Sequence, residues 1–360
     1  MKIDKVVFSS SEEYSDFWNL QSFIWNKFLG IEPVCLLWGK VKNTNMHDRY
    51  GQIIEKEYNE DLIKSFQLTW SKFHHTSTEP ETTWIIGDMD LVPLQTKWFK
   101  TNIELIHEDS YTHLASAEHE RRVASRRVEL VNEVDSTQRP ELFIRPEFYM
   151  KLYAENRVGI GTYGGFVDGP YGADLPAYYH AAKGKTFIKA LDLENGSFED
   201  QVRKVIESNK FGYGPQRTLT KAEAQEHLSH IPIDKQELYY WLADENYTSH
   251  KIYNAIQEKK IRYEIAHVPA GNPIDRLDRA DWNGTKYTWN LEKVLQGELP
   301  PHPSFVQFFS NFPPGLREIG PGMNMEAFLK RRYFIDIHCH RPYNEQKDSL
   351  QQIVMTAFGA

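Results

Sequence analysis

The sequence predicts an α/β protein built on an open mixed sheet with helices on both faces. Three observations support this fold class. Apolar runs of strand length recur near the start of the chain, amphipathic segments separate them, and 40% of the residues are hydrophobic. Apolar runs without strict alternation are typical of strands buried on both faces of a sheet. The 360 residues are enough for one large α/β domain.

The first 110 residues or so alternate between strand and helix patterns. We expect strands at residues 5–10, 33–39 and 84–86, and helices at residues 11–28, 59–75 and 94–105. Gly30 follows the first helix in the usual terminating position. Residues 40–58 are polar and are expected to be irregular. A strand–helix–strand opening implies parallel pairing, so this half is predicted to be Rossmann-like and to bind a nucleotide.

The pattern changes from Tyr111 onward, where strands look shorter and loops longer. Helical segments are expected at residues 198–208, 221–228, 247–256 and 348–358, and an extended segment at residues 333–343. We predict one domain over residues 1–360, with a nucleotide-binding half at about 1–115 and a more irregular half at about 116–360 that includes a C-terminal extension.

Composition restricts the partners and the compartment. The net charge is -8, whereas a protein that binds a nucleic-acid backbone usually carries a basic excess, so nucleic acid is not the expected partner. Cys35 and Cys339 cannot form a disulfide framework. No apolar run reaches the length of a transmembrane helix, and the first residues lack a signal-peptide core. These features predict a cytoplasmic protein; they leave its oligomeric state open.

The segment around which the chain is organised is an acidic turn after the strand at residues 84–86. Gly87 lets the chain turn, and the carboxylates of Asp88 and Asp90 follow, separated by one residue. In an extended backbone both carboxylates point to the same side. Two hard oxygen ligands at the carboxyl end of a buried strand indicate half of a Mg²⁺ or Mn²⁺ site. The alternative is a solvated turn that contains two acids.

A second acidic pair, Asp244 and Glu245, follows apolar and aromatic residues and directly precedes a helical run. Acids at a helix N-terminus are favourable by about 0.3–1 kcal/mol, which is one explanation for the pair. The other is catalytic, because a carboxylate beside Tyr240 and Trp241 could accept a proton from a hydroxyl group.

Near the end of the chain, His338 and His340 flank Cys339 in the extended segment, and Arg341 follows. Both imidazoles lie on one face if the segment is a strand. They could complete a metal site, with the guanidinium of Arg341 binding an anionic leaving group. The alternative is that both histidines pack against the final helix. A thiolate-rich zinc site cannot be built, because Cys35 is the one cysteine besides Cys339.

Taken in order, these features resemble metal-dependent glycosyltransferases of the GT-A fold. The resemblance rests on the first strand–helix unit, the strand that leads into Asp88-Met89-Asp90 and Pro93-Leu94, the later acidic pair and the C-terminal histidine. It spans most of the chain and assigns no subfamily. Long insertions between the clusters depart from the family pattern and leave the acceptor half hard to align.

The resemblance implies a function and a set of roles. Asp90 would bind the metal directly, Asp88 would contact the ribose or the metal through water, and His338 or His340 would supply a further ligand. Asp244 or Glu245 would be the acceptor-side carboxylate. The donor would be a nucleotide sugar, with UDP favoured and GDP the second choice, and the acceptor a glycan or another hydroxyl compound. The sequence does not decide between inversion and retention at the anomeric carbon.

Two rival functions remain at this stage. A nucleotidyltransferase also uses strand-borne acids and a divalent metal, but it usually needs a third carboxylate and a phosphate-binding loop, and the N-terminal sequence shows neither. A non-catalytic carbohydrate-binding protein would explain the abundance of aromatic residues, which make up 13% of the chain, but not the acidic turn.

Overall fold

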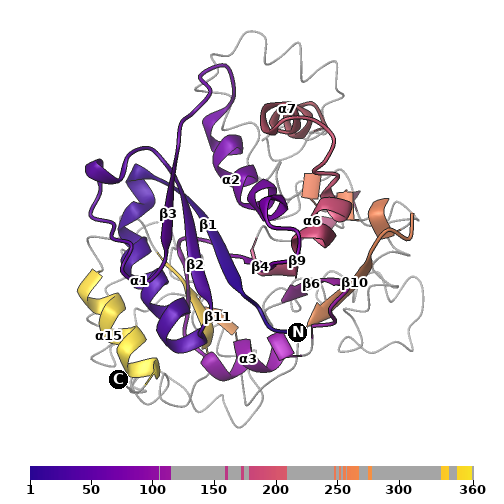
Figure 1. The fold of residues 1–360 in the computed structure, drawn as a ribbon. Helices are drawn as coiled ribbons and strands as arrows, with labels where there is room; N and C mark the ends of the chain where they lie inside the picture. The colour runs from indigo at the N-terminus through magenta and orange to yellow at the C-terminus, as the bar shows by residue number, and fades with distance from the viewer. Residues whose placement is uncertain are drawn as a thin grey trace.

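A computed structural model describes the chain over twelve segments. They are residues 1–104, 106–114, 159–160, 172–173, 178–208, 247–248, 251–252, 254–256, 258–266, 275–277, 334–339 and 347–358. Figure 1 shows these segments as a sheet with helices packed on it.

The main sheet has seven strands in the order β10-β6-β9-β4-β1-β2-β3. Its strands are β1 (Lys5–Ser11), β2 (Glu32–Trp38), β3 (Gln52–Lys56), β4 (Thr83–Ile86), β6 (Ser110–Leu114), β9 (His180–Lys183) and β10 (Arg262–Ala266). Strand β9 runs antiparallel to both of its neighbours, and every other pair in this sheet is parallel. The fold is therefore the open mixed α/β sheet that the sequence predicts.

Two smaller sheets complete the described strands. One has the order β11-β12-β5, built from β11 (Asp275–Leu277), β12 (Phe334–His338) and β5 (Leu91–Pro93). The other pairs β7 (Gly159–Ile160) with β8 (Gly172–Ala173). Because β5 follows β4 directly, the second sheet joins the C-terminal part of the chain to the acidic turn.

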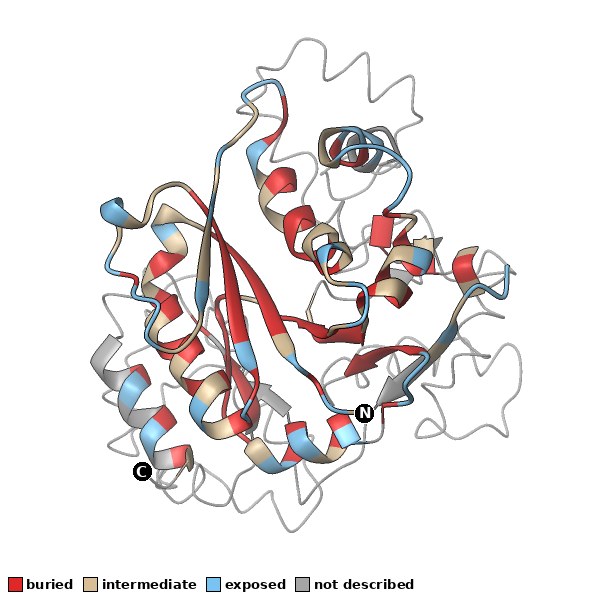
Figure 2. Cartoon of the chain, in the orientation of Figure 1, coloured by how far each residue is buried: buried red, intermediate tan, exposed pale blue. Residues whose placement is uncertain are grey.

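Helices cover both faces of the main sheet (Figures 1 and 2). One face carries α1 (Trp18–Ile24), the π-helical turn η2 (Trp25–Leu29), α3 (Thr96–Glu104) and α15 (Lys347–Phe358). The other face carries α2 (Lys64–His75), α6 (Gly184–Leu191) and α7 (Phe198–Ser208). Short 3-10 turns are η1 (Glu12–Phe17), η3 (Val41–Asn43) and η4 (Thr76–Thr78).

The buried strands explain why the apolar runs do not alternate. In β1, Val6 and Phe8 enter the core beneath α1, whereas Val7 enters the core beneath α2. In β4, Ile85 faces the first core, and Trp84 and Ile86 face the second. Because side chains alternate between two apolar faces, the runs Val6 to Phe8 and Trp84 to Ile86 are apolar at consecutive positions.

Most expected elements in the described part of the chain are confirmed, with two local differences. Residues 52–56 form strand β3 at the edge of the sheet, although the segment was expected to be irregular. The side chains of β3 are only partly buried, so backbone pairing with β2 stabilises this strand. Helix α2 begins at Lys64 rather than at residues 59–61, and Ile63 takes the N-cap position without a side-chain cap. The expected helix at 221–228 lies outside the described residues.

The two predicted halves contribute to one sheet. Strands β9 and β10, at residues 180–183 and 262–266, join the same seven-stranded sheet as the strands of residues 1–115. The boundary near residue 115 stays a prediction.

Candidate functional site

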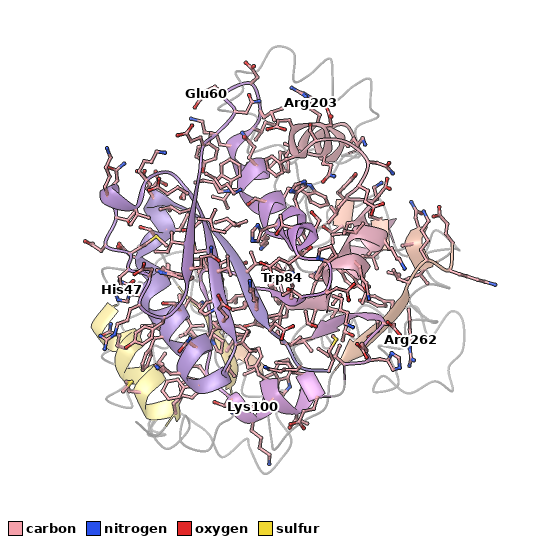
Figure 3. All side chains as sticks on the ribbon, viewed as in Figure 1. His47, Glu60, Trp84, Lys100, Arg203 and Arg262 are labelled. Carbon is pink, nitrogen blue, oxygen red and sulfur yellow. The ribbon has the colours of Figure 1, made fainter. Side chains whose placement is uncertain are left out.

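The acidic turn lies where the strand order of the sheet reverses. From β1 the chain passes through α1 to β2 and β3 on one side, and then through α2 to β4 on the other side. In open α/β sheets the crevice outside the carboxyl ends of the strands at such a reversal is the usual ligand site. Strand β4 contains Trp84, which Figure 3 labels near the middle of the molecule, and leads directly into Gly87 and Asp88.

Gly87 is required by close packing. Its amide donates a hydrogen bond to the carbonyl of Val7 at 2.8 Å, which extends the pairing between β4 and β1. A Cβ atom at this position would lie 2.3 Å from Cε1 of Phe8, well inside van der Waals contact. The ring of Phe8 therefore fills the space that any other residue would need, and it sets where the backbone leaves the sheet.

The residues after Gly87 form a turn rather than an extended segment. The amide of Leu91 donates to the carbonyl of Asp88 at 3.2 Å, and the amide of Met89 donates to Oδ1 of Asp88 at 3.1 Å. Because the backbone turns here, the two-residue spacing of Asp88 and Asp90 does not by itself place their carboxylates on one side, as an extended strand would.

A buried glutamine from helix α1 holds this turn. The amide nitrogen of Gln21 lies 3.3 Å from the carbonyl oxygen of Asp88, 3.1 Å from that of Met89 and 2.6 Å from that of Leu91. Its side-chain oxygen accepts a hydrogen bond from Nε1 of Trp25 at 3.2 Å, which fixes the orientation of the amide. The sequence marks Gln21 only as a polar residue within the buried face of a helix.

Strand β12 reaches the same turn from the other end of the chain. It pairs antiparallel with β5, and His338 is in register with Leu91. The amide of Cys339 then donates to the carbonyl of Asp90 at 2.8 Å. The backbone of the predicted histidine segment is therefore bonded to the acidic turn. The side chain of His338, and all of His340 and Arg341, lie outside the described residues.

The two carboxylates of the turn differ in exposure. The side chain of Asp88 is 40% exposed, whereas Asp90 retains 3% of its accessible surface. Beneath Asp88 lies Lys72 of helix α2, whose side chain is 4% exposed. Nζ of Lys72 is 3.9 Å from Oδ1 of Asp88 and 3.5 Å from the carbonyl oxygen of Gly87. No sequence pattern singled out Lys72.

At the neighbouring strand, Glu12 fixes the loop that leaves β2. Its Oε1 accepts hydrogen bonds from the amide of Lys40 at 2.7 Å and from Nδ2 of Asn43 at 2.9 Å. These donors stabilise the carboxylate and lower the pKa of Glu12. Trp38, the last residue of β2, stacks on Tyr58 with ring centroids 4.9 Å apart. These contacts fix the carboxyl edge of β1 and β2.

The residues at the turn fit a hard divalent cation in part. Asp88 and Asp90 offer carboxylate oxygens, which Mg²⁺ and Mn²⁺ prefer. Within the described residues no group of three or more His, Cys, Asp or Glu side chains gathers that could hold a metal ion. Within the described residues, a third His, Cys, Asp or Glu ligand is therefore not supplied. Asp244 and Glu245, the predicted acceptor-side carboxylates, lie outside that part of the chain.

No protein-family model and no curated protein matches this chain. Among solved structures, the apo structure of WbbM, described as a bifunctional glycosyltransferase, aligns with 99% of this chain and 51% of its own, at 10% identity and a TM-score of 0.40. The chain therefore spans about half the length of that protein.

The helices of the described segments include none that is both long enough and apolar enough to cross a membrane.

Proposed function

We propose that this protein is a metal-dependent glycosyltransferase that moves a sugar from a nucleotide-diphosphate donor, UDP-sugar favoured, to a hydroxyl acceptor. The observation that supports it best is the position of Asp88 and Asp90. They lie in a rigidly held turn at the carboxyl end of a central strand, beside the reversal point of an open α/β sheet. Diphosphate ligands are typical of that place in such folds.

The reaction breaks the bond between the anomeric carbon and the β-phosphate oxygen, and forms a bond from that carbon to the acceptor oxygen. The nucleoside diphosphate leaves with the bonding electron pair, and the acceptor loses its proton. A bound divalent ion supplies Lewis-acid stabilisation of the leaving diphosphate. In this proposal Asp88 and Asp90 hold that ion, His338 or His340 adds a ligand, and Arg341 binds the diphosphate.

Asp244 or Glu245 takes the acceptor proton in this proposal if the reaction inverts the anomeric centre, and binds the acceptor if it retains configuration.

The hydrogen bonding of the turn suits this chemistry. The carbonyl groups of Asp88, Met89, Asp90 and Leu91 each accept a hydrogen bond from another part of the protein, so the carboxylates are attached to a fixed backbone. A cation held by carboxylates on a fixed backbone would stabilise the negative charge that develops on the leaving diphosphate without rearrangement.

The first test replaces the carboxylates. Asp90→Ala is expected to abolish transfer and Asp88→Ala to reduce it severely, because each removes an oxygen ligand. Asp48→Ala, at an exposed acid elsewhere, is the matched control and should keep full activity. Activity is measured with a panel of nucleotide sugars, after thermal melting confirms that each variant is folded. Near-normal transfer by either turn variant would contradict the assignment.

The second test measures donor binding directly. By titration calorimetry, UDP should bind the wild-type protein more tightly in Mn²⁺ or Mg²⁺ than in EDTA, and GDP serves as the comparison nucleotide. Equal affinity in both conditions would exclude a metal-bridged diphosphate. Binding of free sugars without any nucleotide binding would instead favour a carbohydrate-binding protein.

A further inference from the structure

Lys72 is a buried cation directly beneath the acidic turn. Helix α2 holds its backbone, because Trp70 and Phe73 on either side of it pack into the core between the helix and the sheet. The Lys72 side chain is 4% exposed and ends 3.9 Å from the half-exposed carboxylate of Asp88. A lysine is rarely buried to this extent, since removing an ammonium group from water is costly unless it is paired.

The pairing of Lys72 is loose. For comparison, Lys5 at the other end of β1 binds both carboxylate oxygens of Glu79, at 2.8 and 2.9 Å. Within the described residues, the contacts recorded for the ammonium of Lys72 to oxygen are longer, at 3.5 Å to the carbonyl of Gly87 and 3.9 Å to Asp88. These distances are too long for a tight structural ion pair, yet they place the ammonium group of Lys72 next to the acidic turn.

We infer that Lys72 is a positioning residue that supplies the acidic turn with a fixed positive charge. This inference rests on the proposed function. The ammonium of Lys72 lies 3.9 Å from the carboxylate of Asp88 and opposes part of its negative charge. An anionic diphosphate bound at the turn gains from that charge, whereas a metal ion bound there alone is repelled by it. Lys72 therefore weakens binding of the metal ion alone and strengthens binding of the metal ion together with the diphosphate.

The consequence is a pair of effects with opposite signs. Removing the charge of Lys72 should tighten binding of Mn²⁺ alone and weaken binding of UDP in the presence of Mn²⁺. A unit charge several ångströms away, in a partly solvated site, should change each affinity by roughly three- to tenfold. A variant that merely loosened the turn would weaken both, so the crossed result separates an electrostatic role from a structural one.

The experiment uses Lys72→Met, Lys72→Gln and Lys72→Arg in the full chain. Mn²⁺ affinity without nucleotide is measured by electron paramagnetic resonance, and UDP affinity at saturating Mn²⁺ by calorimetry. The neutral variants should show the crossed shift, and Lys72→Arg should remain within about twofold of wild type because it keeps the charge. Lys5→Met, which removes a partly buried, ion-paired lysine away from the turn, is the matched control and should change neither affinity.

Three outcomes overturn the inference: both affinities fall together, neither changes, or Lys72→Arg behaves like Lys72→Met. If Lys72→Met does not fold, as judged by thermal melting, Lys72→Gln retains a polar end group and decides the matter. Failure of the proposed function looks different. In that case wild-type protein would show no Mn²⁺-dependent UDP binding, and the measurements with Mn²⁺ alone would still report whether Lys72 opposes the ion.

Discussion

At the scale of single residues, the acidic turn is fixed by buried side chains that contact its backbone. Gln21 donates to carbonyls on both sides of Asp90 from a fully buried position. Phe8 covers Gly87 so closely that no side chain fits there. Other parts of the chain satisfy the backbone carbonyls of the turn that carries the two acids.

Gln21→Leu tests this arrangement. It keeps the approximate volume but leaves buried carbonyls without a donor, so the free energy of unfolding should fall by about 2–4 kcal/mol. Mn²⁺ affinity should fall as well, because the turn loses its fixed shape. Chemical denaturation and Mn²⁺ titration measure the two effects.

Gln67→Leu is the matched control for Gln21→Leu. Gln67 is equally buried, and its side-chain amide donates to the carbonyls of Asn59 and Leu62 near the start of α2. This variant should lose similar stability without a change in Mn²⁺ affinity once folded. If both variants affected Mn²⁺ binding alike, the contact of Gln21 with the turn would have no special role.

At the scale of elements, strand β12 links the C-terminal part of the chain to the turn. Its antiparallel pairing with β5 ends in the hydrogen bond from the amide of Cys339 to the carbonyl of Asp90. Helix α15 follows and packs into the same core as α1; the rings of Phe28 and Phe358 stack with centroids 4.1 Å apart. The site is therefore closed by residues about 250 positions after Asp88.

Cys339→Pro removes the donor of that hydrogen bond, and Cys339→Ala keeps it. We expect the proline variant to bind Mn²⁺ roughly tenfold more weakly or worse, in line with the effect of losing a group that orients a metal ligand. The alanine variant should remain near wild type in Mn²⁺ affinity, with a modest loss of packing. Electron paramagnetic resonance titration of both purified variants checks this. Equal Mn²⁺ affinity in the two variants would show that the hydrogen bond from β12 does not contribute to metal binding.

At the scale of the whole molecule, two apolar cores stabilise the sheet from opposite faces, and partly buried histidines beside the second core make the fold sensitive to acid. At the end of α2, burial lowers the pKa of His75 to about 4, and the charge of Lys56 acts in the same direction. Burial also lowers the pKa of His74. His75 packs edge-on against Trp84, with ring centroids 5.4 Å apart, so protonation would place a charge against the central strand.

The sign of the pH effect follows from the direction of that shift. The unfolded chain binds a proton at His75 near pH 6.5, whereas the folded protein resists it until about pH 4. Stability is therefore complete above pH 6.5 and is lost as the pH falls toward 4. His75 alone should lower the free energy of unfolding by about 2 kcal/mol between pH 7 and pH 5.

Denaturant unfolding at several pH values measures this loss. His75→Gln should flatten the pH dependence between pH 7 and pH 5. His47→Gln, at an exposed histidine, should leave it as in wild type. A wild-type free energy of unfolding that stayed constant between pH 7 and pH 5 would contradict the lowered pKa of His75.

The sequence by itself determined the local order of the N-terminal half and the place of the acidic turn. Unbroken apolar runs such as Val34 to Leu37 specify strands buried on both faces, and the helical stripe that includes Phe66 and Trp70 specifies the helix between them. These signals are local, because each depends on side-chain periodicity within one segment. The glycine and acids after the last run then fall at a strand end.

Only the tertiary structure decided what surrounds the turn. Strand β9 enters antiparallel between β4 and β6, β3 adds an edge through pairing with β2, and β12 reaches Asp90 from the far end of the chain. The roles of Gln21 and Lys72 likewise depend on contacts with residues 15 to 70 positions away in the sequence. Such contacts depend on which faces and strand edges meet when the chain packs, and no periodicity within a single segment records them.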